Sequence, residues 1–198
     1  MKNSSKKPVA IITGASRGVG AATALLLASK GWNITLTCSS TIKEANAIAM
    51  ACEEYKVEAL AIQADVSDNN DCKNTIDQTI NKWGRIDALI NNAGASKFAW
   101  DHSNLELLDA ADFQKIYSVN LIGPFQMIKA SKEFLMKSDN PSITNVSSIA
   151  GIKGIGSSIA YAASKGALNT MTISMARNLG PIRAVSYTHL TLPTIRSV

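Results

Sequence analysis

The sequence has few residues that could hold a metal ion or build a disulfide framework. Its three cysteines, Cys38, Cys52 and Cys72, are odd in number and lack the close spacing of metal ligands. Cys52 and Cys72 fall within helical patterns, which favours buried or partly buried thiols. These features predict no metal site and a reducing compartment, the cytoplasm.

Long hydrophobic runs are also absent. No apolar stretch is long enough to span a bilayer, and the basic N-terminus MKNSSKK lacks the apolar segment that follows in a secretory signal. The composition, 46% hydrophobic and 18% charged, is typical of soluble globular proteins. We therefore expect no membrane partner, and we expect residues 1–7 to form a flexible basic tail.

The net charge of +5 is spread along the chain. Proteins that bind nucleic acid concentrate basic residues on one face, often with interleaved aromatic residues, and the sequence has no such stripe. Solvated lysines and a mildly positive ligand cleft account for the charge, so we expect no nucleic-acid partner.

Apolar runs alternate along the chain with helical patterns. The predicted strands cover residues 8–13, 33–38, 58–63, 86–90 and 142–147, and the predicted helices cover residues 18–30, 42–55, 69–82, 112–137 and 158–179, with a short helical piece within 103–110. This alternation predicts a single α/β domain with a doubly wound parallel sheet. Pro124 should kink its predicted helix, so that the side chain of nearby Asn120 could reach a functional site instead of packing.

The first predicted strand, PVAIIT, runs directly into the glycine-rich turn GASRGVG and then into a helix. Gly14, Gly18 and Gly20 lack Cβ atoms, so the turn can be tight and a phosphate can approach the backbone. The start of the helix points free N–H groups at that phosphate. A plain tight connection is the alternative, but this strand-to-helix setting favours a nucleotide site.

Two more strands end in small or polar residues. NNAG at 91–94 follows the apolar run IDALI, and ITNVSS at 143–148 delivers Ser148 to the end of its strand. Ligands of open α/β sheets bind at the carboxyl ends of the strands. We therefore expect both segments at the same site as the glycine-rich turn.

Tyr161 and Lys165, in YAASK, are four residues apart and leave one face of a helix. A phenol holds its proton until about pH 10, and an ammonium group one turn away favours the phenolate. The pair can therefore transfer a proton near neutral pH. A half-buried packing role for Tyr161 is the alternative.

These pieces together resemble the short-chain dehydrogenase/reductase family, including its 3-oxoacyl-(acyl carrier protein) reductases. The resemblance runs from about residue 8 to about residue 183 and rests on TGASRGVG at 13–20, Asp65-Val66, NNAG, Asn120 in SVNLIGPF, Ser148 and YAASK. It implies a Rossmann-like dinucleotide-binding fold and an oxidoreductase that transfers a hydride between a nicotinamide cofactor and a carbonyl or secondary alcohol.

The resemblance also assigns catalytic roles. Tyr161 becomes the general acid/base, Lys165 supports it and holds the nicotinamide ribose, and Ser148 donates a hydrogen bond to the substrate oxygen. Asn120 supports a water molecule in a proton relay. Ser148 as a simple strand-end hydroxyl, and Asn120 as a helix-breaking polar residue, are the alternatives.

The cofactor would lie along the ends of the strands. The residues expected to bind it are Gly14, Ser16, Arg17, Gly18, Val19, Gly20, Ser39, Asp65, Val66, Asn92, Ala93, Gly94, Tyr161 and Lys165. Asp65 would accept from the adenine amino group and Val66 would pack on the ring, although Asp65 could instead cap the following helix.

Charge favours NADP(H) over NAD(H). NAD-preferring enzymes place a carboxylate after the second strand, where it accepts from the ribose 2′-hydroxyl and repels a 2′-phosphate. Here Ser39 and Ser40 follow NITLTC. Arg17 can place its guanidinium beside a 2′-phosphate, and Lys43 could assist, although Arg17 could also be a solvated loop cation.

The substrate itself is not evident from the sequence. Phe98, Trp100 and His102 make the segment 95–109, where the family often contacts substrate, partly apolar. The family also suggests a homodimer or homotetramer formed through the helices at 112–137 and 158–179. A non-catalytic, redox-sensing dinucleotide-binding protein of the same fold is the alternative function.

The resemblance stops after Arg183, where the family continues into a sixth strand, a lid and a seventh strand. The chain instead reads AVSYTHLTLPTIRSV, and VSYTHLTLPT resembles a translated sequencing-library adapter. We therefore expect a truncated catalytic domain over residues 8–184 that lacks its last two strands, followed by a non-native tail over 185–198. A protein cut in this way should be poorly soluble and inactive. A real but divergent short strand is the alternative.

Overall fold

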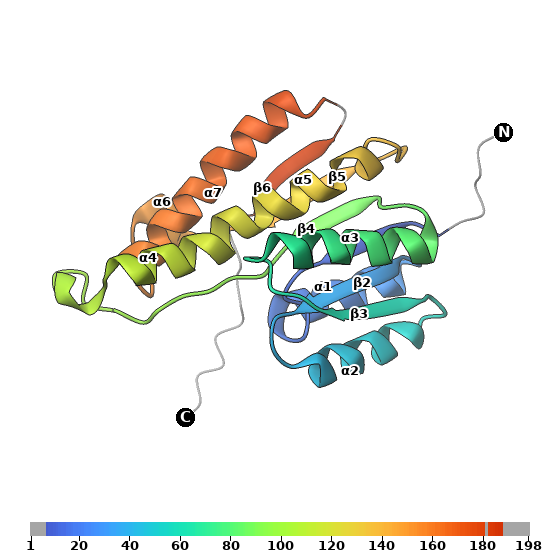
Figure 1. Cartoon of the computed structure of the whole chain (residues 1–198), viewed down its shortest axis with the longest axis horizontal. Coiled ribbons are helices and arrows are strands. Elements are labelled where there is room, and N and C mark those ends of the chain that lie inside the picture. Colours follow the sequence, from blue (N-terminus) through green and yellow to red (C-terminus); the bar gives the residue numbers. More distant parts are fainter. Residues whose placement is uncertain (1–6, 181, 188–198) are drawn as a thin grey trace.

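The sheet is built from short runs of buried residues. The computed structural model describes residues 7–180 and 182–187. Six parallel strands form one sheet in the order β3-β2-β1-β4-β5-β6 (Figure 1). They are β1 (Val9–Ile12), β2 (Asn33–Cys38), β3 (Ala59–Gln63), β4 (Ala88–Asn91), β5 (Ser142–Val146) and β6 (Arg183–Tyr187). The strand order reverses between β1 and β4, which is where doubly wound sheets bind ligands.

Helices cover both faces of the sheet, as Figure 1 shows. The helices are α1 (Gly18–Ser29), α2 (Ile42–Glu53), α3 (Asn69–Trp83), α4 (Ala110–Tyr117), α5 (Gly123–Leu135), α6 (Ala150–Lys153) and α7 (Ile159–Asn178). Alternate residues of β1 face opposite ways. Ala10 and Ile12 pack in the core beneath α1 and α2, whereas Ile11 packs in the core beneath α3 and α5. The expected α/β fold with a doubly wound parallel sheet is confirmed.

The predicted long helix at 112–137 consists of α4, a π-helical segment at Ser118–Ile122 and α5. Asp109 begins α4 earlier than expected, because its side chain and that of Asp112 cap each other's backbone N–H groups. Pro124 lies in the first turn of α5, where its missing N–H is tolerated. The widened π turn before Pro124 thus accommodates the proline, and the two helices run on in nearly one direction (Figure 1). The short helical piece expected within 103–110 is a 3-10 turn at Leu105–Leu107.

The expected loss of the sixth strand is wrong. Arg183–Tyr187 forms β6, which pairs in parallel with β5 from Ser142↔Arg183 to Val146↔Tyr187. The strand forms because the edge of β5 presents backbone N–H and C=O groups that a parallel segment can satisfy. The boundary expected at 184–185 therefore falls inside a strand. Residues 188–198, the rest of the expected tail, lie outside the described residues, as do residues 1–6 of the expected N-terminal tail.

All three cysteines are buried, as expected for Cys52 and Cys72. Burial raises the pKa of Cys52 to about 11 and that of Cys72 to about 12, with nearby carboxylates adding to the effect. Both thiols therefore stay protonated and behave as core residues. Over residues 7–180 and 182–187, no helix is long and apolar enough to cross a membrane.

Candidate active site

Two loops at the carboxyl ends of β1 and β4 are fastened together. Thr13 Oγ1 accepts hydrogen bonds from the backbone N–H groups of Asn92 and Ala93, both at 3.0 Å. In return, Asn92 Nδ2 donates to the carbonyl oxygens of Thr13 at 3.0 Å and Gly14 at 2.9 Å. Asn92, expected to bind the cofactor, thus uses its side chain to hold the glycine-rich loop in place.

The glycine-rich loop needs glycine for reasons of space. Gly14 has a φ of +62°, and a Cβ there would lie 2.8 Å from the Cα of Ala93. A Cβ on Gly20 would lie 2.5 Å from Asn92 Nδ2. A side chain at either position would therefore displace the segment of Asn92 and Ala93 that is hydrogen-bonded to the glycine-rich loop.

Helix α1 starts directly after this loop. Arg17 occupies its N-cap position without a side-chain capping bond, and the first turn contains no acidic residue. The first N–H groups of the helix therefore have no side-chain acceptor from the cap. Such N–H groups, with the positive end of the helix dipole, suit a phosphate.

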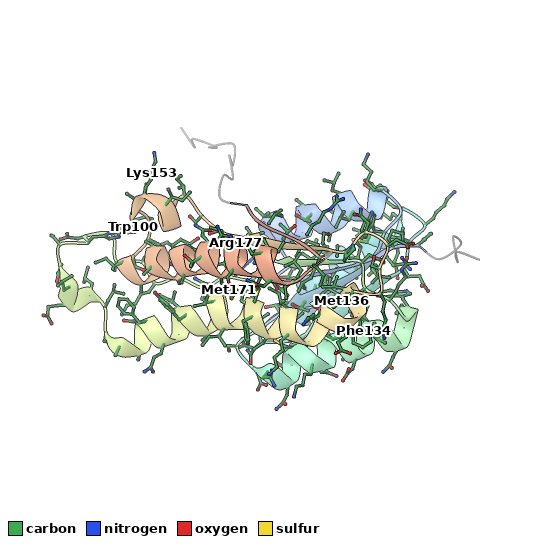
Figure 2. All side chains as sticks on the ribbon, turned by 90° about the horizontal axis from the view of Figure 1, so that it is seen from above. Trp100, Phe134, Met136, Lys153, Met171 and Arg177 are labelled. Atoms are coloured by element: carbon green, nitrogen blue, oxygen red, sulfur yellow. The ribbon has the colours of Figure 1, made fainter. Side chains whose placement is uncertain are left out.

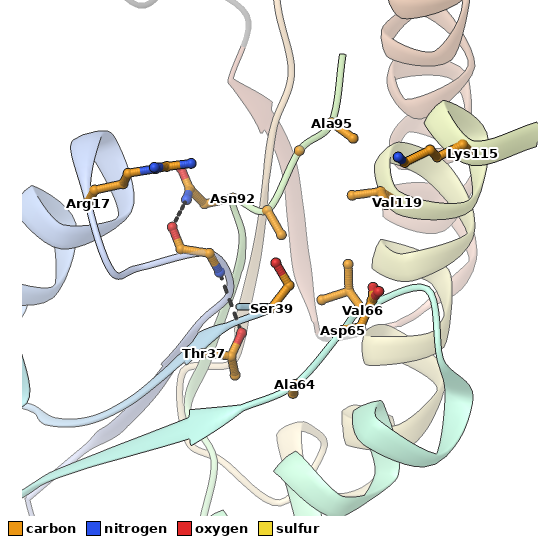
Figure 3. Close-up of a pocket in the computed structure, with 13 residues that line it drawn as sticks. Arg17, Thr37, Ser39, Ala64, Asp65, Val66, Asn92, Ala95, Lys115 and Val119 are labelled. Carbon is orange, nitrogen blue, oxygen red and sulfur yellow. Dashed lines mark hydrogen bonds between the residues drawn. The ribbon is translucent and has the colours of Figure 1, made fainter. Parts of the chain in front are cut away.

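A cleft of about 420 Å³ opens beside this loop (Figure 3). It is lined by Gly14, Arg17, Thr37, Ser39, Ala64, Asp65, Val66, Asn92, Ala93, Gly94, Ala95, Lys115 and Val119. The structure thus brings together eight of the residues expected at the cofactor: Gly14, Arg17, Ser39, Asp65, Val66, Asn92, Ala93 and Gly94. Six expected residues do not line the cleft: Ser16, Gly18, Val19 and Gly20 belong to the loop and first turn of α1, and Tyr161 and Lys165 line a second pocket.

The residues that the sequence missed come from other elements. Thr37 lies near the carboxyl end of β2, and its place in the predicted strand 33–38 could have located it at the cleft. Lys115 and Val119 reach the cleft from α4 and the π segment. Their position depends on how the helices pack over the sheet, which no local motif reports.

The carboxylate of Asp65 organises the turn after β3. Its Oδ1 accepts from the backbone N–H of Ser67 at 2.9 Å and from the Ser67 hydroxyl at 2.8 Å. The cap of α3 is Asp68, which accepts from Asn70 N, so the capping role considered for Asp65 belongs to Asp68. Asp65 remains exposed at the cleft beside the buried Val66.

The charges at the cleft are mainly positive. Arg17 and Lys115 lie on opposite sides of it (Figure 3). Ser39 lies at the end of β2, where the turn carries no carboxylate. Lys43 is exposed and does not line the cleft, and its assistance to Arg17 stays a prediction.

A second pocket of about 530 Å³ adjoins the first, and Asn92, Gly94 and Ala95 line both. Tyr161 and Lys165 enter it from α7. The Nζ atom of Lys165 lies 5.8 Å from the centre of the Tyr161 ring, so the expected helical pairing is present.

Lys165 is buried, with 4% of its surface exposed. Its Nζ donates to the carbonyl oxygen of Val146 at 2.8 Å. Burial lowers the pKa of Lys165 from 10.5 to about 8. The group is therefore still mostly protonated at pH 7, yet it titrates close to neutrality.

Asn120 lies in the π segment and is fully buried. Its Nδ2 donates to Ala95 O at 2.9 Å and to Ser164 Oγ at 3.0 Å, while its Oδ1 accepts from Ala95 N at 2.7 Å. The side chain is therefore packed and lines neither pocket, although its Oδ1 would lie 3.6 Å from a Cβ on Gly94, which lines both. The side chain instead fastens the loop after β4 to α7.

Ser148 lies beside the second pocket but does not line it, whereas Ser147 does. Ser148 Oγ accepts from the backbone N–H of Ala150 at 3.1 Å. Its own hydroxyl proton can still be donated, because an acceptor bond uses only a lone pair. Ser147 is buried and donates to the carbonyl oxygen of Lys165 at 3.2 Å.

Known proteins share this arrangement. A family model described as short chain dehydrogenase matches residues 8–195. A protein named as a ketoacyl reductase of the granaticin polyketide synthase, from Streptomyces violaceoruber, is 36% identical over 174 residues, which cover 88% of this chain and 68% of the relative. A 3-oxoacyl-[acyl-carrier-protein] reductase of Synechocystis sp. is 33% identical over 171 residues, which cover 86% and 68%.

A solved structure is similar over most of the chain. A protein described as a short-chain dehydrogenase/reductase from Burkholderia xenovorans superimposes with a TM-score of 0.89 and 43% identity, covering 93% of this chain and 77% of the other. The family model spans the glycine-rich loop, Thr13 and Asn92, and the Tyr161–Lys165 pair. The protein belongs to the short-chain dehydrogenase family of oxidoreductases, which bind nicotinamide dinucleotides.

Proposed function

We propose that the protein transfers a hydride between NADP(H) and a carbonyl compound or secondary alcohol, with Tyr161 as the general acid/base. The observation that carries the proposal is the buried ammonium group of Lys165, 5.8 Å from the centre of the Tyr161 ring. Both residues line the second pocket, which shares Asn92, Gly94 and Ala95 with the cleft beside the glycine-rich loop.

The residues at the cleft fit a dinucleotide. Gly14 has no room for a Cβ and keeps the loop backbone against Ala93, and the first turn of α1 offers N–H groups without acidic neighbours. Asp65 and Val66 line the opposite part of the cleft, as a polar partner and an apolar surface for a base. When bound, the nicotinamide ring supplies or accepts the hydride.

The chain's own residues handle the proton. In reduction, the Tyr161 hydroxyl gives its proton to the carbonyl oxygen while the carbonyl carbon gains the hydride, which leaves a phenolate and an alcohol. In oxidation, the phenolate takes the proton of the alcohol. The buried ammonium group of Lys165 places a positive charge near the Tyr161 oxygen as it loses its proton, and Ser148 donates a hydrogen bond to the substrate oxygen.

Asn120 contributes by position. Its side chain holds Ala95, which lines both pockets, against α7. The loop after β4 and the helix that carries Tyr161 therefore keep a fixed separation. The water-relay role that the family resemblance implies for Asn120 remains a prediction.

The preference for NADP(H) rests on charge. Ser39 stands where a carboxylate would select NAD(H), and the exposed guanidinium of Arg17 lines the same cleft. A charge-assisted hydrogen bond of this type contributes about 1.5–3 kcal/mol, which corresponds to a preference of about tenfold or more.

The cofactor test measures the Kd of NADPH and NADH for the purified full-length protein by fluorescence. We expect NADPH to bind more tightly, and Arg17→Gln to weaken NADPH about tenfold while leaving NADH nearly unchanged. Lys43→Gln is the matched control, because Lys43 is exposed outside the cleft. Tighter binding of NADH by the wild-type protein would refute the preference.

The catalytic test uses Tyr161→Phe. We expect this variant to bind NADPH normally and to lose carbonyl reduction by at least about a hundredfold. Wild-type protein that binds NADPH but turns over no carbonyl or alcohol would support the non-catalytic, redox-sensing alternative. Undiminished turnover by the variant would remove Tyr161 from the mechanism.

We also propose a cytoplasmic homodimer or homotetramer. Ile122 and Phe125 near the start of α5 and Ile173 on α7 are 48%, 46% and 54% exposed, respectively. These residues offer an apolar surface on the helices expected at the interface. Analytical ultracentrifugation tests this proposal, and a strictly monomeric protein at micromolar concentration would contradict it.

A further inference from the structure

Two aromatic side chains stand at the mouth of the second pocket. Phe98 and Trp100 stack with their ring centroids 5.3 Å apart and their planes inclined by 26°. They are 71% and 70% exposed, respectively. Both rings line the same pocket as Tyr161 and Lys165. Exposed apolar surface that lines a pocket often marks a ligand-binding site.

The backbone that carries the two rings is pinned. Ala99, between them, is buried and donates its N–H to the carbonyl oxygen of Ser157 at 2.6 Å. A ring nitrogen of His102 lies 3.2 Å from the carbonyl oxygen of Gly156. The loop is thus tied to the turn before α7, and Trp100 stands at the end of the molecule where Lys153 of α6 also lies (Figure 2).

The other side of the pocket leaves room for a flat molecule. Gly156 has a φ of +114°, and a Cβ there would lie 3.3 Å from Ala150 Cβ and 4.0 Å from Tyr161 Cδ1. The missing side chain keeps the space next to the Tyr161 ring open. Among the residues that the structure describes, the pocket lining contains no carboxylate, and Lys165 is its one charged residue. The pocket volume of about 530 Å³ is within the range of small-molecule sites.

The segment that carries the two rings is acidic, which gives little support to a substrate tethered to a carrier. An acyl group bound to a carrier protein arrives on an arm that contains a phosphate. The segment 95–112 carries four carboxylates, Asp101, Glu106, Asp109 and Asp112, against the single lysine Lys97. Lys97 is already paired with Asp112 at 2.6 Å. This segment therefore holds no unpaired lysine or arginine that could bind such a phosphate.

We infer that the substrate is a free, small aromatic carbonyl compound whose ring stacks on Phe98 and Trp100 while its carbonyl oxygen reaches Tyr161. This inference rests on the proposed function. The reaction consumes the aryl ketone, NADPH and one proton, and forms the aryl alcohol and NADP⁺. The carbonyl carbon gains the hydride, and its oxygen gains the proton from Tyr161.

The first experiment compares kcat/KM for three substrates: acetophenone, cyclohexyl methyl ketone and an acetoacetyl thioester of coenzyme A. Cyclohexyl methyl ketone has the same number of carbons as acetophenone but no aromatic face. We expect acetophenone to be preferred. Phe98→Leu and Trp100→Leu should each lower the ratio of kcat/KM for acetophenone to kcat/KM for cyclohexyl methyl ketone by about twofold to tenfold. Trp100→Phe, which keeps an aromatic ring, should retain the wild-type ratio.

The matched control is Tyr55→Leu. Tyr55 is a half-exposed aromatic residue after α2 that lines neither pocket, so its replacement should leave the ratio unchanged. The Kd of NADPH should be the same in all these variants. A preference for the thioester, or a kcat/KM ratio that neither ring replacement changes, would overturn the inference while leaving the proposed function intact.

A binding measurement separates the two proposals. Acetophenone should quench the fluorescence of Trp100, and Phe98→Leu should weaken this binding. Quenching in a protein that reduces no carbonyl would retain the aromatic site and reject the proposed function. Variants that change the size of the protein in solution, but not ligand binding, would show that the rings contact a second copy instead, which would overturn the inference.

Discussion

Replacing Lys165 by methionine should stabilise the protein at neutral pH. Burial lowers the pKa of Lys165 from 10.5 to about 8, so the folded state binds the proton less tightly than the unfolded state. At pH 7 this difference costs the folded protein about 3 kcal/mol. The Lys165→Met substitution would remove that cost but would lose the hydrogen bond to Val146 O, worth about 1 kcal/mol. The expected net gain in the free energy of unfolding is about 2 kcal/mol.

The stability gained by Lys165→Met should shrink as the pH rises. Because the folded-state pKa is depressed, the cost of Lys165 is fully present below about pH 8 and fades as the pH rises toward 10.5. At pH 10 it should fall to about 1 kcal/mol, so the advantage of the variant should nearly vanish.

Urea unfolding at pH 7 and pH 10, followed by both circular dichroism and fluorescence, measures this change. Lys129→Met, at an exposed position of α5, is the matched control and should show no such dependence. A Lys165→Met variant that is no more stable than wild type at pH 7, or whose gain is the same at pH 10, would refute the reasoning.

Two further predictions concern the framework of the site. Gly14→Ala should lower the free energy of unfolding by about 2–3 kcal/mol and weaken NADPH binding, because its Cβ would meet Ala93. Gly31→Ala, which has a positive φ but no atom within 4 Å of the added Cβ, should cost only about 1 kcal/mol; equal losses would contradict the steric argument. Burial raises the pKa of Asp87, but hydrogen bonds from Arg85, Ser138 and Val9 outweigh it and leave the pKa lowered. Asp87→Asn should therefore cost about 2 kcal/mol at pH 7, a loss that disappears as the pH falls through the folded-state pKa of Asp87; a loss that persists in acid would contradict this origin.

The sequence predicted the strands and helices well where one signal dominated. β1 and β2 are buried runs that no helical pattern interrupts, and their predicted bounds agree with the structure to within a residue at each end. Pattern alone could not predict the π segment at Ser118–Ile122, because it depends on how Asn120 is held between Ala95 and Ser164. β6 was missed because its stability comes from the edge of β5 rather than from a local signal.

The sequence motifs named residues that lie at the candidate site, but they did not reveal the hydrogen bonds between those residues. The structure places Gly14 and Arg17 of the glycine-rich loop, Asp65, NNAG and the Tyr161–Lys165 pair at two adjoining pockets, and their roles there stay predictions. The motifs did not reveal that Thr13 is the acceptor that joins the two loops. Nor did they separate Ser147, which lines the second pocket, from Ser148, which accepts from Ala150 N.

The motif residues differ in what they still offer to a ligand. Asn92 gives its amide to Thr13 and Gly14, and Asn120 gives its amide to Ala95 and Ser164, so both act chiefly through the framework. Lys165 donates to Val146 O alone among the described residues, and an ammonium group has three N–H donors. Two donors therefore remain for a ligand next to Tyr161. Changes at the two asparagines should lower stability, whereas Lys165→Met should raise it and should also slow the proton transfer that we propose for Tyr161.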